Sequence, residues 1–149
     1  MDKVSVDGVL LTPLKQILHP KGNVFHGIKK SDPGFNGFAE AYFSMIHCGD
    51  IKPWKKHLRM TLNFIIPMGN IRFVIYDDRE QSLTKGLFFD VVLGESNYQR
   101  LTIPKGLWVA FQGIGEGTNL LLNVANLEHD PGEIERKENI DDIKYEWKR

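Results

Sequence analysis

Short runs in which apolar and polar residues alternate follow one another along most of the chain. Between them lie segments rich in Gly, Pro, Asn and Asp, such as HPKGN, DPGFNG, PMGN, GESN and IPKG. Alternation with a period of two, bounded by such turn residues, is typical of strands with one buried face. The pattern therefore predicts strands near residues 8–18, 23–29, 38–48, 57–67, 70–78, 87–94, 98–104, 107–114 and 118–126.

The abundance of short strands decides the fold class. Many short strands in a chain of 149 residues favour a sandwich or a barrel, and a jelly roll suits this size best. The C-terminal segment HDPGEIERKENIDDIKYEWKR is charged and lacks an apolar period, and we expect one helical turn there before a short strand at 143–147. We therefore predict one all-β jelly-roll domain over residues 1–149 that ends in a short irregular and helical segment.

Composition and charge narrow the range of partners. Lys plus Arg equals Asp plus Glu, 19 each, so bulk charge gives no reason to expect nucleic acid or an anionic membrane as a partner. No stretch reaches the roughly 20 apolar residues of a membrane helix, and the first residues do not form a signal peptide. The single cysteine, Cys48, cannot form an internal disulfide. We expect a cytoplasmic protein.

The strand expected at 57–67 carries the first candidate site. Its two faces alternate between polar and apolar side chains. The polar face consists of His57, Arg59, Thr61 and Asn63. This face either meets water or lines a barrel mouth that holds one small polar ligand. The preceding Trp54-Lys55-Lys56 adds an aromatic ring and two cations, which a phosphate-bearing ligand requires.

Two further side chains are candidates for chemistry. On the strand at 70–78, Asp77 ends a face that is otherwise apolar. A carboxylate there either has a cation or a histidine as its partner or caps the following turn. Tyr42 shares a strand face with Glu40 and Ser44, where its hydroxyl either lines a pocket or meets solvent.

The histidines do not form a metal-binding motif. They are His19, His26, His47, His57 and His129. No pair has the spacing of metal ligands on one element. We therefore predict that the protein binds no metal.

Several of these features together resemble a known family. The matching residues are Lys21-Gly22 in an early turn, Asp77, Arg79 and Ser82 in a D-x-R-x-x-S run, and Ile103, Pro104 and Gly106 in an I-P-x-G turn. With these motifs in this order, residues 8–130 resemble the dTDP-4-dehydrorhamnose 3,5-epimerase family of nucleotide-sugar epimerases. Members of that family are cupin-type jelly rolls, also called double-stranded β-helices.

The resemblance implies a reaction and a set of site residues. Such enzymes remove a proton next to the keto group of an NDP-4-keto-6-deoxy sugar and return it on the opposite face, without a cofactor. His57 falls at the position of the base and Asp77 at that of an active-site acid. The enolate oxygen needs hydrogen-bond donors, and the diphosphate needs cations. The implied substrate-binding residues are Lys21, Trp54, Lys55, Lys56, Arg59, Asn63, Arg79, Trp108, Gln112 and Asn123.

The sequence also departs from that family at several places. Val109 stands where the family has a second histidine, and the stretch VANLEHDP lacks the family's proton-returning tyrosine. Tyr42, His26 or water would then return the proton. The family's lysine early in the strand after the base is replaced near Leu62 and Asn63. A carboxylate that pairs with the base is expected from the segment ENIDD, at Asp141 or Asp142.

We therefore expect a cofactor-independent isomerase that epimerises a nucleotide-linked keto sugar at C3, C5 or both, in cell-surface polysaccharide or deoxysugar biosynthesis. A 3,4-ketoisomerase of the same fold is one alternative. A non-catalytic jelly roll that binds a sugar nucleotide is the other. The resemblance further implies a homodimer whose subunits exchange the segment GVLLTPLKQIL.

Overall fold

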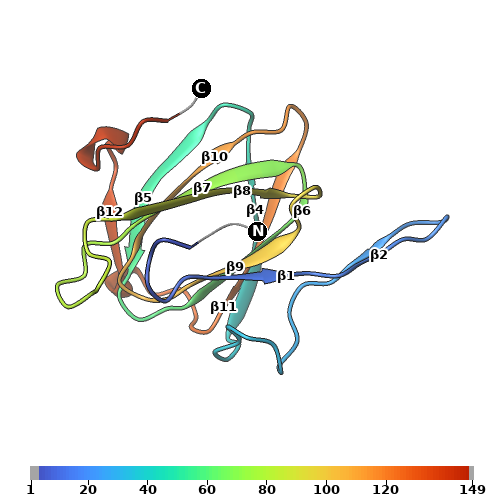
Figure 1. Cartoon of the computed structure of the whole chain (residues 1–149), viewed down its shortest axis with the longest axis horizontal. Coiled ribbons are helices and arrows are strands. Elements are labelled where there is room, and N and C mark those ends of the chain that lie inside the picture. Colours follow the sequence, from blue (N-terminus) through green and yellow to red (C-terminus); the bar gives the residue numbers. More distant parts are fainter. Residues whose placement is uncertain (1–3, 148–149) are drawn as a thin grey trace.

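The computed structural model describes residues 4–147, and its main elements are two five-stranded antiparallel sheets (Figure 1). Sheet I has the strand order β1 (Leu10–Pro13), β9 (Gln99–Ile103), β6 (Leu62–Met68), β11 (Asn119–Ala125) and β4 (Glu40–Ile46). Sheet II has the order β12 (Ile134–Lys137), β5 (Ile51–His57), β10 (Trp108–Gly113), β7 (Asn70–Tyr76) and β8 (Phe88–Gly94). The remaining elements are the hairpin of β2 (Gln16–Ile17) and β3 (Val24–Phe25) and the 3-10 helices η1 (Pro131–Glu133) and η2 (Ile140–Asp142). The predicted all-β fold is confirmed.

The main core lies between the two sheets, where the alternating apolar residues of each strand meet. The inward side chains of β6 pack with those of β7, and the rings of Phe64 and Phe73 stack with centroids 5.2 Å apart. Burial of such apolar surface is the main favourable term in folding. None of the helices among residues 4–147 is long and apolar enough to cross a membrane.

The continuous strand predicted at 57–67 is wrong. The chain bends at residues 58–61, so that β5 ends at His57 and β6 starts at Leu62. The bend changes which residues face inward, because alternation restarts on a different sheet. Met60, Leu62 and Phe64 therefore face the interior together with His57, whereas Asn63 lies on the outer face of sheet I.

Strands β5 and β12 were not predicted, because Lys and Glu occupy many of their positions and hide the apolar alternation. The predicted strand at 143–147 does not form. Instead, the segment after β12 covers the outer face of sheet II, where Ile143, Tyr145 and Trp147 pack near Trp54 and Trp108. The indole N–H of Trp54 donates to the carbonyl of Ile140 at 2.9 Å. This cover explains why both faces of sheet II are apolar.

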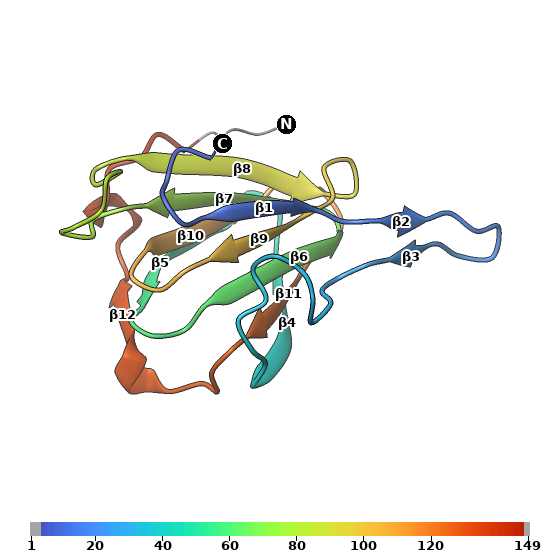
Figure 2. The same cartoon turned by 60° about the horizontal axis from the view of Figure 1, so that its bottom comes forward.

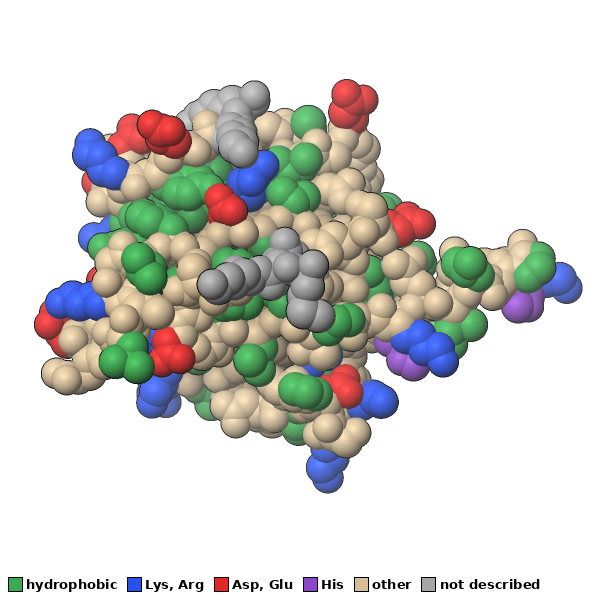
Figure 3. Space-filling model, in the orientation of Figure 1, with side chains coloured by type: hydrophobic (Ala, Val, Ile, Leu, Met, Phe, Trp, Pro, Cys, Tyr) green, Lys and Arg blue, Asp and Glu red, His purple; other side chains and the backbone are tan. Residues whose placement is uncertain are grey.

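The hairpin of β2 and β3 projects away from both sheets as an arm (Figure 2). Ile17, Leu18 and Val24 are exposed on it, and Figure 3 shows hydrophobic, lysine and histidine side chains along the arm. The loop that follows lies over the outer face of sheet I. The fully buried guanidinium of Arg100 donates there to the carbonyls of Gly27 and Pro33.

Candidate active site

A pocket opens between the edge strand β4 of sheet I and the strands β5 and β12 of sheet II. Its polar wall on β4 consists of Glu40, Tyr42 and Ser44, which are inward at alternate positions. Its wall on sheet II consists of Lys52, Pro53, Lys55, His57, Ile134 and Arg136. The other lining residues are Met60, Leu62, Phe64, Val109, Phe111, Leu121 and His129. The pocket thus has ionisable groups on two facing walls and an apolar floor.

His57 and Glu133 form a hydrogen-bonded pair at one end of this pocket. The Nδ1 atom of His57 lies 2.5 Å from Oε1 of Glu133, whose side chain is 1% exposed. The other oxygen of Glu133 accepts from the backbone N–H groups of Arg59 at 3.1 Å and Met60 at 3.2 Å. Burial alone would raise the pKa of Glu133, but these hydrogen bonds outweigh it and hold the pKa below its usual value. A charged carboxylate therefore holds one nitrogen of His57, and the other nitrogen is left for a ligand.

The local sequence explains how Glu133 reaches this position. Asp130 caps η1 by accepting from the N–H of Gly132, and Glu133 ends that single turn. The next residue, Ile134, pairs with His57 in the β12–β5 ladder, and the N–H of Leu58 donates to the carbonyl of Glu133 at 2.8 Å. Our sequence analysis missed Glu133. The available signal was an Asp-Pro-Gly-Glu capping turn next to a short alternating run.

The carboxylate predicted from the segment ENIDD is not the partner of His57. Asp141 and Asp142 lie on η2, where both are exposed. Glu133, which precedes them by eight and nine residues, binds His57 instead. A capped turn can bring a distant carboxylate under a strand, and spacing alone gives no indication of it.

Three cations gather further along the same wall. Lys55 pairs with Arg136 in the β12–β5 ladder, and Lys52 donates to Ser44 Oγ across the pocket at 3.2 Å. Desolvation of its ammonium and the positive charges of Arg136 and Lys52 lower the pKa of Lys55. Like charges held together in this way attract an anion. Lys55 was predicted to bind substrate, whereas Lys52 and Arg136 were not.

Four of the predicted substrate contacts lie on the opposite face of sheet II, under the C-terminal segment. They are Trp54, Lys56, Trp108 and Gln112. Asp78 accepts from Lys56 Nζ at 2.8 Å and from Trp108 Nε1 at 2.9 Å, and Lys56 lies over the Trp108 ring. These side chains therefore stabilise the fold on the side of the sheet away from the pocket.

Three more predicted contacts are also placed elsewhere. Arg59 is exposed and pairs with Asp130 at 2.9 Å, which fastens the bend to the start of η1. Asn63 is buried on the outer face of sheet I, where its amide oxygen accepts from Arg100. Lys21 lies at the tip of the arm, away from the pocket of its own chain (Figure 2).

Asp77 and Arg79 do not line the pocket either. The fully buried Asp77 accepts from the Arg79 guanidinium at 2.9 Å and from the hydroxyls of Ser82 at 2.5 Å and Thr84 at 2.7 Å. Burial opposes the ionisation of Asp77, but these hydrogen bonds prevail and hold its pKa far below the usual value. This group of residues, which we call the Asp77 cluster, organises the turn after β7.

Tyr42 and Asn123 lie on the neighbouring strands β4 and β11 of sheet I. Tyr42 lines the pocket, and its hydroxyl accepts from the amide of the buried Asn123 at 3.1 Å. Asn123 and Tyr42 are paired in the β11–β4 ladder, which fixes this contact. Of the three catalytic residues predicted from the sequence, the structure therefore brings His57 and Tyr42 to one pocket and leaves Asp77 outside it.

Comparison with known proteins identifies the family. A crystal structure of a dTDP sugar isomerase from Desulfovibrio desulfuricans superposes with a TM-score of 0.90 and 37% sequence identity, over 95% of this chain and 90% of that one. The chain belongs to the dTDP-sugar isomerase and epimerase family. This finding confirms the predicted family, the predicted jelly-roll fold and the predicted class of enzyme.

Two curated relatives agree with this assignment. The probable low-salt glycan biosynthesis epimerase of Haloferax volcanii is 40% identical over 84 residues, which are 56% of this chain and 54% of that protein. The match therefore spans about half the length of that relative. The spore coat polysaccharide biosynthesis protein SpsL of Bacillus subtilis is 26% identical over 132 residues, 89% of this chain and 87% of that protein.

More distant structures share the fold alone. ChmJ, a 3'-monoepimerase from Streptomyces bikiniensis, superposes with a TM-score of 0.86 at 16% identity, over 99% of this chain and 78% of that one. No protein-family model matches the chain.

Proposed function

We propose that this protein epimerises an NDP-4-keto-6-deoxy sugar at C3, C5 or both, with His57 as the base. The observation that carries the proposal is the His57–Glu133 pair at the end of a pocket that also holds three cations. The solved relative at 37% identity is described as a dTDP sugar isomerase, which supports dTDP as the nucleotide. The curated relatives are described as proteins of glycan and spore coat polysaccharide biosynthesis, which supports a role in making a cell-surface polysaccharide.

The His57–Glu133 geometry suits removal of a proton from carbon. A ketone acidifies the C–H bond beside it, so the protein needs only a base that works near neutral pH and a stabiliser for the enolate. Glu133 accepts the Nδ1–H of His57, which leaves Nε2 with its lone pair as the basic nitrogen. The same carboxylate stabilises the imidazolium that forms after proton removal. Epimerisation of this kind requires neither a redox change nor a cofactor.

The cations provide the complementary charge. Lys55 lies on the same face of β5 as His57, two residues away, so its ammonium suits an enolate oxygen next to the base. Lys52 and Arg136 continue the positive wall toward β4, where a diphosphate would be bound. This arrangement replaces the predicted diphosphate ligands Lys21, Lys56 and Arg79 with Lys52 and Arg136 and keeps Lys55. Tyr42 remains the sequence-based candidate for proton return, while His26 lies outside the pocket, where its carbonyl accepts from Tyr98.

We further propose that the protein works as a cytoplasmic homodimer and as one jelly-roll domain. The arm carries exposed apolar residues, namely Ile17, Leu18 and Val24. A second patch of exposed apolar residues, Phe43 and Met45, lies on the outer face of β4. Surfaces of this kind are typical of contacts between subunits. Dimer formation through the arm is tested by the mass of the protein in solution with and without residues 15–26.

Deuterium exchange tests the proposed reaction. The protein is incubated in deuterium oxide with dTDP-4-keto-6-deoxyglucose, and the sugar is followed by proton NMR and mass spectrometry. We expect deuterium at C3 or C5 together with inversion, and loss of both by a factor of about 10²–10⁴ in His57→Ala.

The matched control is His47→Ala, which removes an exposed histidine that does not line the pocket and should leave the rate unchanged. Conversion of the 4-ketone to a 3-ketone would identify a 3,4-ketoisomerase instead. Binding of dTDP without exchange at any carbon would contradict an enzyme and favour the non-catalytic alternative.

A further inference from the structure

A second histidine belongs to the pocket. His129 is exposed, and it lines the pocket together with His57. The loop that carries it follows β11 of sheet I, whereas His57 ends β5 of sheet II. The two imidazoles that line the pocket therefore come from different segments of the chain, one at the end of β5 and one on the loop after β11.

The loop of His129 is fastened at three points, one at a pocket residue of β4 and two at the bend that follows His57. The N–H of His129 donates to Glu40 Oε1 at 2.7 Å, and Glu40 itself lines the pocket. Before it, the side chain of Asn126 accepts from the N–H of Thr61 at 2.8 Å. After it, Asp130 accepts from the guanidinium of Arg59 at 2.9 Å. The main chain at His129 is thus held against β4 and against the bend that follows His57.

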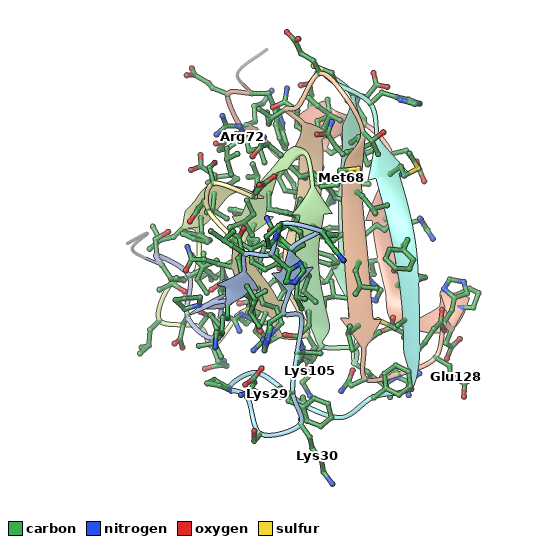
Figure 4. The ribbon with its side chains drawn as sticks, turned by 90° about the vertical axis from the view of Figure 1, so that its right-hand side faces the viewer. Lys29, Lys30, Met68, Arg72, Lys105 and Glu128 are labelled. Atoms are coloured by element: carbon green, nitrogen blue, oxygen red, sulfur yellow. The ribbon has the colours of Figure 1, made fainter. Side chains whose placement is uncertain are left out.

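The strand register places both histidines at the same end of the pocket. Glu40, which accepts from the N–H of His129, pairs with Ala125 on β11, and Ala125 pairs in turn with Leu62 on β6, so that the three form one row across sheet I. Leu62 is the first residue of β6 after the bend that follows His57. Figure 4 shows Glu128 at the same end of the barrel as Lys105, with Met68 at the other end. The turn that contains Lys105 contacts the base directly, because the N–H of Gly106 donates to the carbonyl of His57 at 2.7 Å.

Tyr42 is less suited to the second proton transfer. It lies in the next row, with Asn123 and Phe64, one row further from the end of the pocket where His57 and Glu40 lie, and its hydroxyl oxygen accepts from the amide of Asn123. A phenol also gives up its proton less readily near neutral pH than an imidazolium does. The side chain of His129 is exposed at the pocket mouth, so solvent can restore its proton after each turnover.

We propose that His129 is the second catalytic histidine of this site and protonates the sugar carbon on the face opposite to His57. The inference rests on the proposed function. His57 takes the proton, and the electrons of the broken C–H bond move to the carbonyl oxygen to give the enolate. The imidazolium of His129 then gives its proton to the same carbon, the ketone re-forms, and both histidines exchange their protons with solvent. No oxidant, reductant or co-reactant is consumed.

The test compares inversion with exchange in deuterium oxide, again with dTDP-4-keto-6-deoxyglucose. In His129→Asn we expect inversion to fall about 10²–10⁴-fold, while deuterium still enters the recovered, uninverted substrate because His57 still removes the proton. His57→Asn should lose both signals. Tyr42→Phe should slow inversion and exchange in equal proportion.

Two further measurements separate catalysis from folding. Free imidazole added to His129→Ala should restore inversion, because the exposed site admits imidazolium, which can donate the proton in place of the His129 side chain. A merely structural role would not be rescued in this way. Titration with dTDP should show that the variants still bind the nucleotide. Inversion by His129→Asn at the wild-type rate would overturn the assignment of His129 and leave the proposed function intact. Wild-type protein that shows neither exchange nor inversion would contradict both the assignment of His129 and the proposed function.

Discussion

Two carboxylates in this chain are buried to nearly the same extent, yet only one of them binds a side chain that lines the pocket. Asp77 is 0% exposed and Glu133 is 1% exposed, and hydrogen bonds hold the pKa of each below its usual value. Asp77 is bound by Arg79 and two hydroxyls, which keep their protons near neutral pH. Glu133 is bound by the imidazole of His57, a type of side chain that acts as a general base. Burial and a low pKa therefore do not identify a catalytic carboxylate; the chemistry of its partner does.

The two regions are nevertheless connected through one turn. The N–H of Gly106 donates to the carbonyl of His57, and a Cβ atom at Gly106 would lie 3.3 Å from Cδ of Arg79. The side chain of Arg79 is in turn held by Asp77. The D-x-R-x-x-S and I-P-x-G motifs thus support the backbone of His57, the proposed base, from outside the pocket. This explains why the motifs occur together with the site although their residues do not line it.

The largest effect on stability is expected at Asp77. Asp77→Asn places an amide N–H group against the guanidinium of Arg79 and leaves that cation without its carboxylate. Breaking a buried ion pair costs about 3–5 kcal/mol, and the lower end applies because the Arg79 side chain is 27% exposed. Urea unfolding should show this loss, while kcat per folded molecule should stay within a few-fold of wild type.

The pH dependence of unfolding sharpens the same comparison. Because the pKa of Asp77 is lower in the folded state, its contribution is complete above the unfolded value of about 4 and is lost as the pH falls through the folded value. Asp77→Asn should therefore flatten the stability curve below about pH 4. Asp50→Asn, at an exposed aspartate, is the control and should leave the curve unchanged. A wild-type curve in Asp77→Asn would contradict the proposed stabilising role of this cluster.

The next largest effect is expected on the rate, at Glu133. In Glu133→Gln the amide oxygen can keep the bonds from the N–H groups of Arg59 and Met60, but the amide NH₂ then faces Nδ1 of His57. Such contact favours the tautomer that carries its proton on Nε2, the nitrogen meant to act as the base. We expect kcat to fall by about 10²-fold or more with little change in KM, as measured by steady-state assay of epimerisation.

Glu135→Gln provides the control for this variant, because Glu135 lies two residues after Glu133, on β12, and is exposed. It should retain the wild-type kcat. A Glu133→Gln protein that folds normally and keeps its kcat would show that Glu133, like Asp77, only stabilises the fold. The contrast between the two carboxylates would then disappear.

The sequence was sufficient for the fold class and the family, and it selected His57, which lines the pocket. Period-two alternation located most strands, and the order of three motifs led to the family. It did not reveal the course of the chain after His57, because the bend at 58–61 restarts the alternation on another sheet. The polar face assigned to Arg59 and Asn63 was therefore wrong, and so was the expectation of a continuous strand.

Long-range pairing accounts for the remaining differences. Glu133 lies 76 residues from His57 in the sequence, in a charged segment with no periodicity to indicate burial. Trp54 and Lys56 looked like ligand contacts because the C-terminal cover of their sheet face could not be foreseen. Asp77, in contrast, had its cation two residues away at Arg79, and local reading of the sequence could have paired them.

The smallest effect is expected at the turn that joins the two regions. Gly106 has a φ of +88°, and an added Cβ would lie 3.3 and 3.4 Å from Cδ and Cγ of Arg79. Gly106→Ala should therefore cost about 1–2 kcal/mol, seen as a Tm lower by about 2–8 °C. The N–H of residue 106 remains, so kcat should fall only a few-fold. Gly117→Ala, where nothing lies within 4 Å of the new methyl group, is the matched control. A loss of kcat in Gly106→Ala as large as that in Glu133→Gln, without loss of stability, would mean that the turn sets the position of the base and does more than support it.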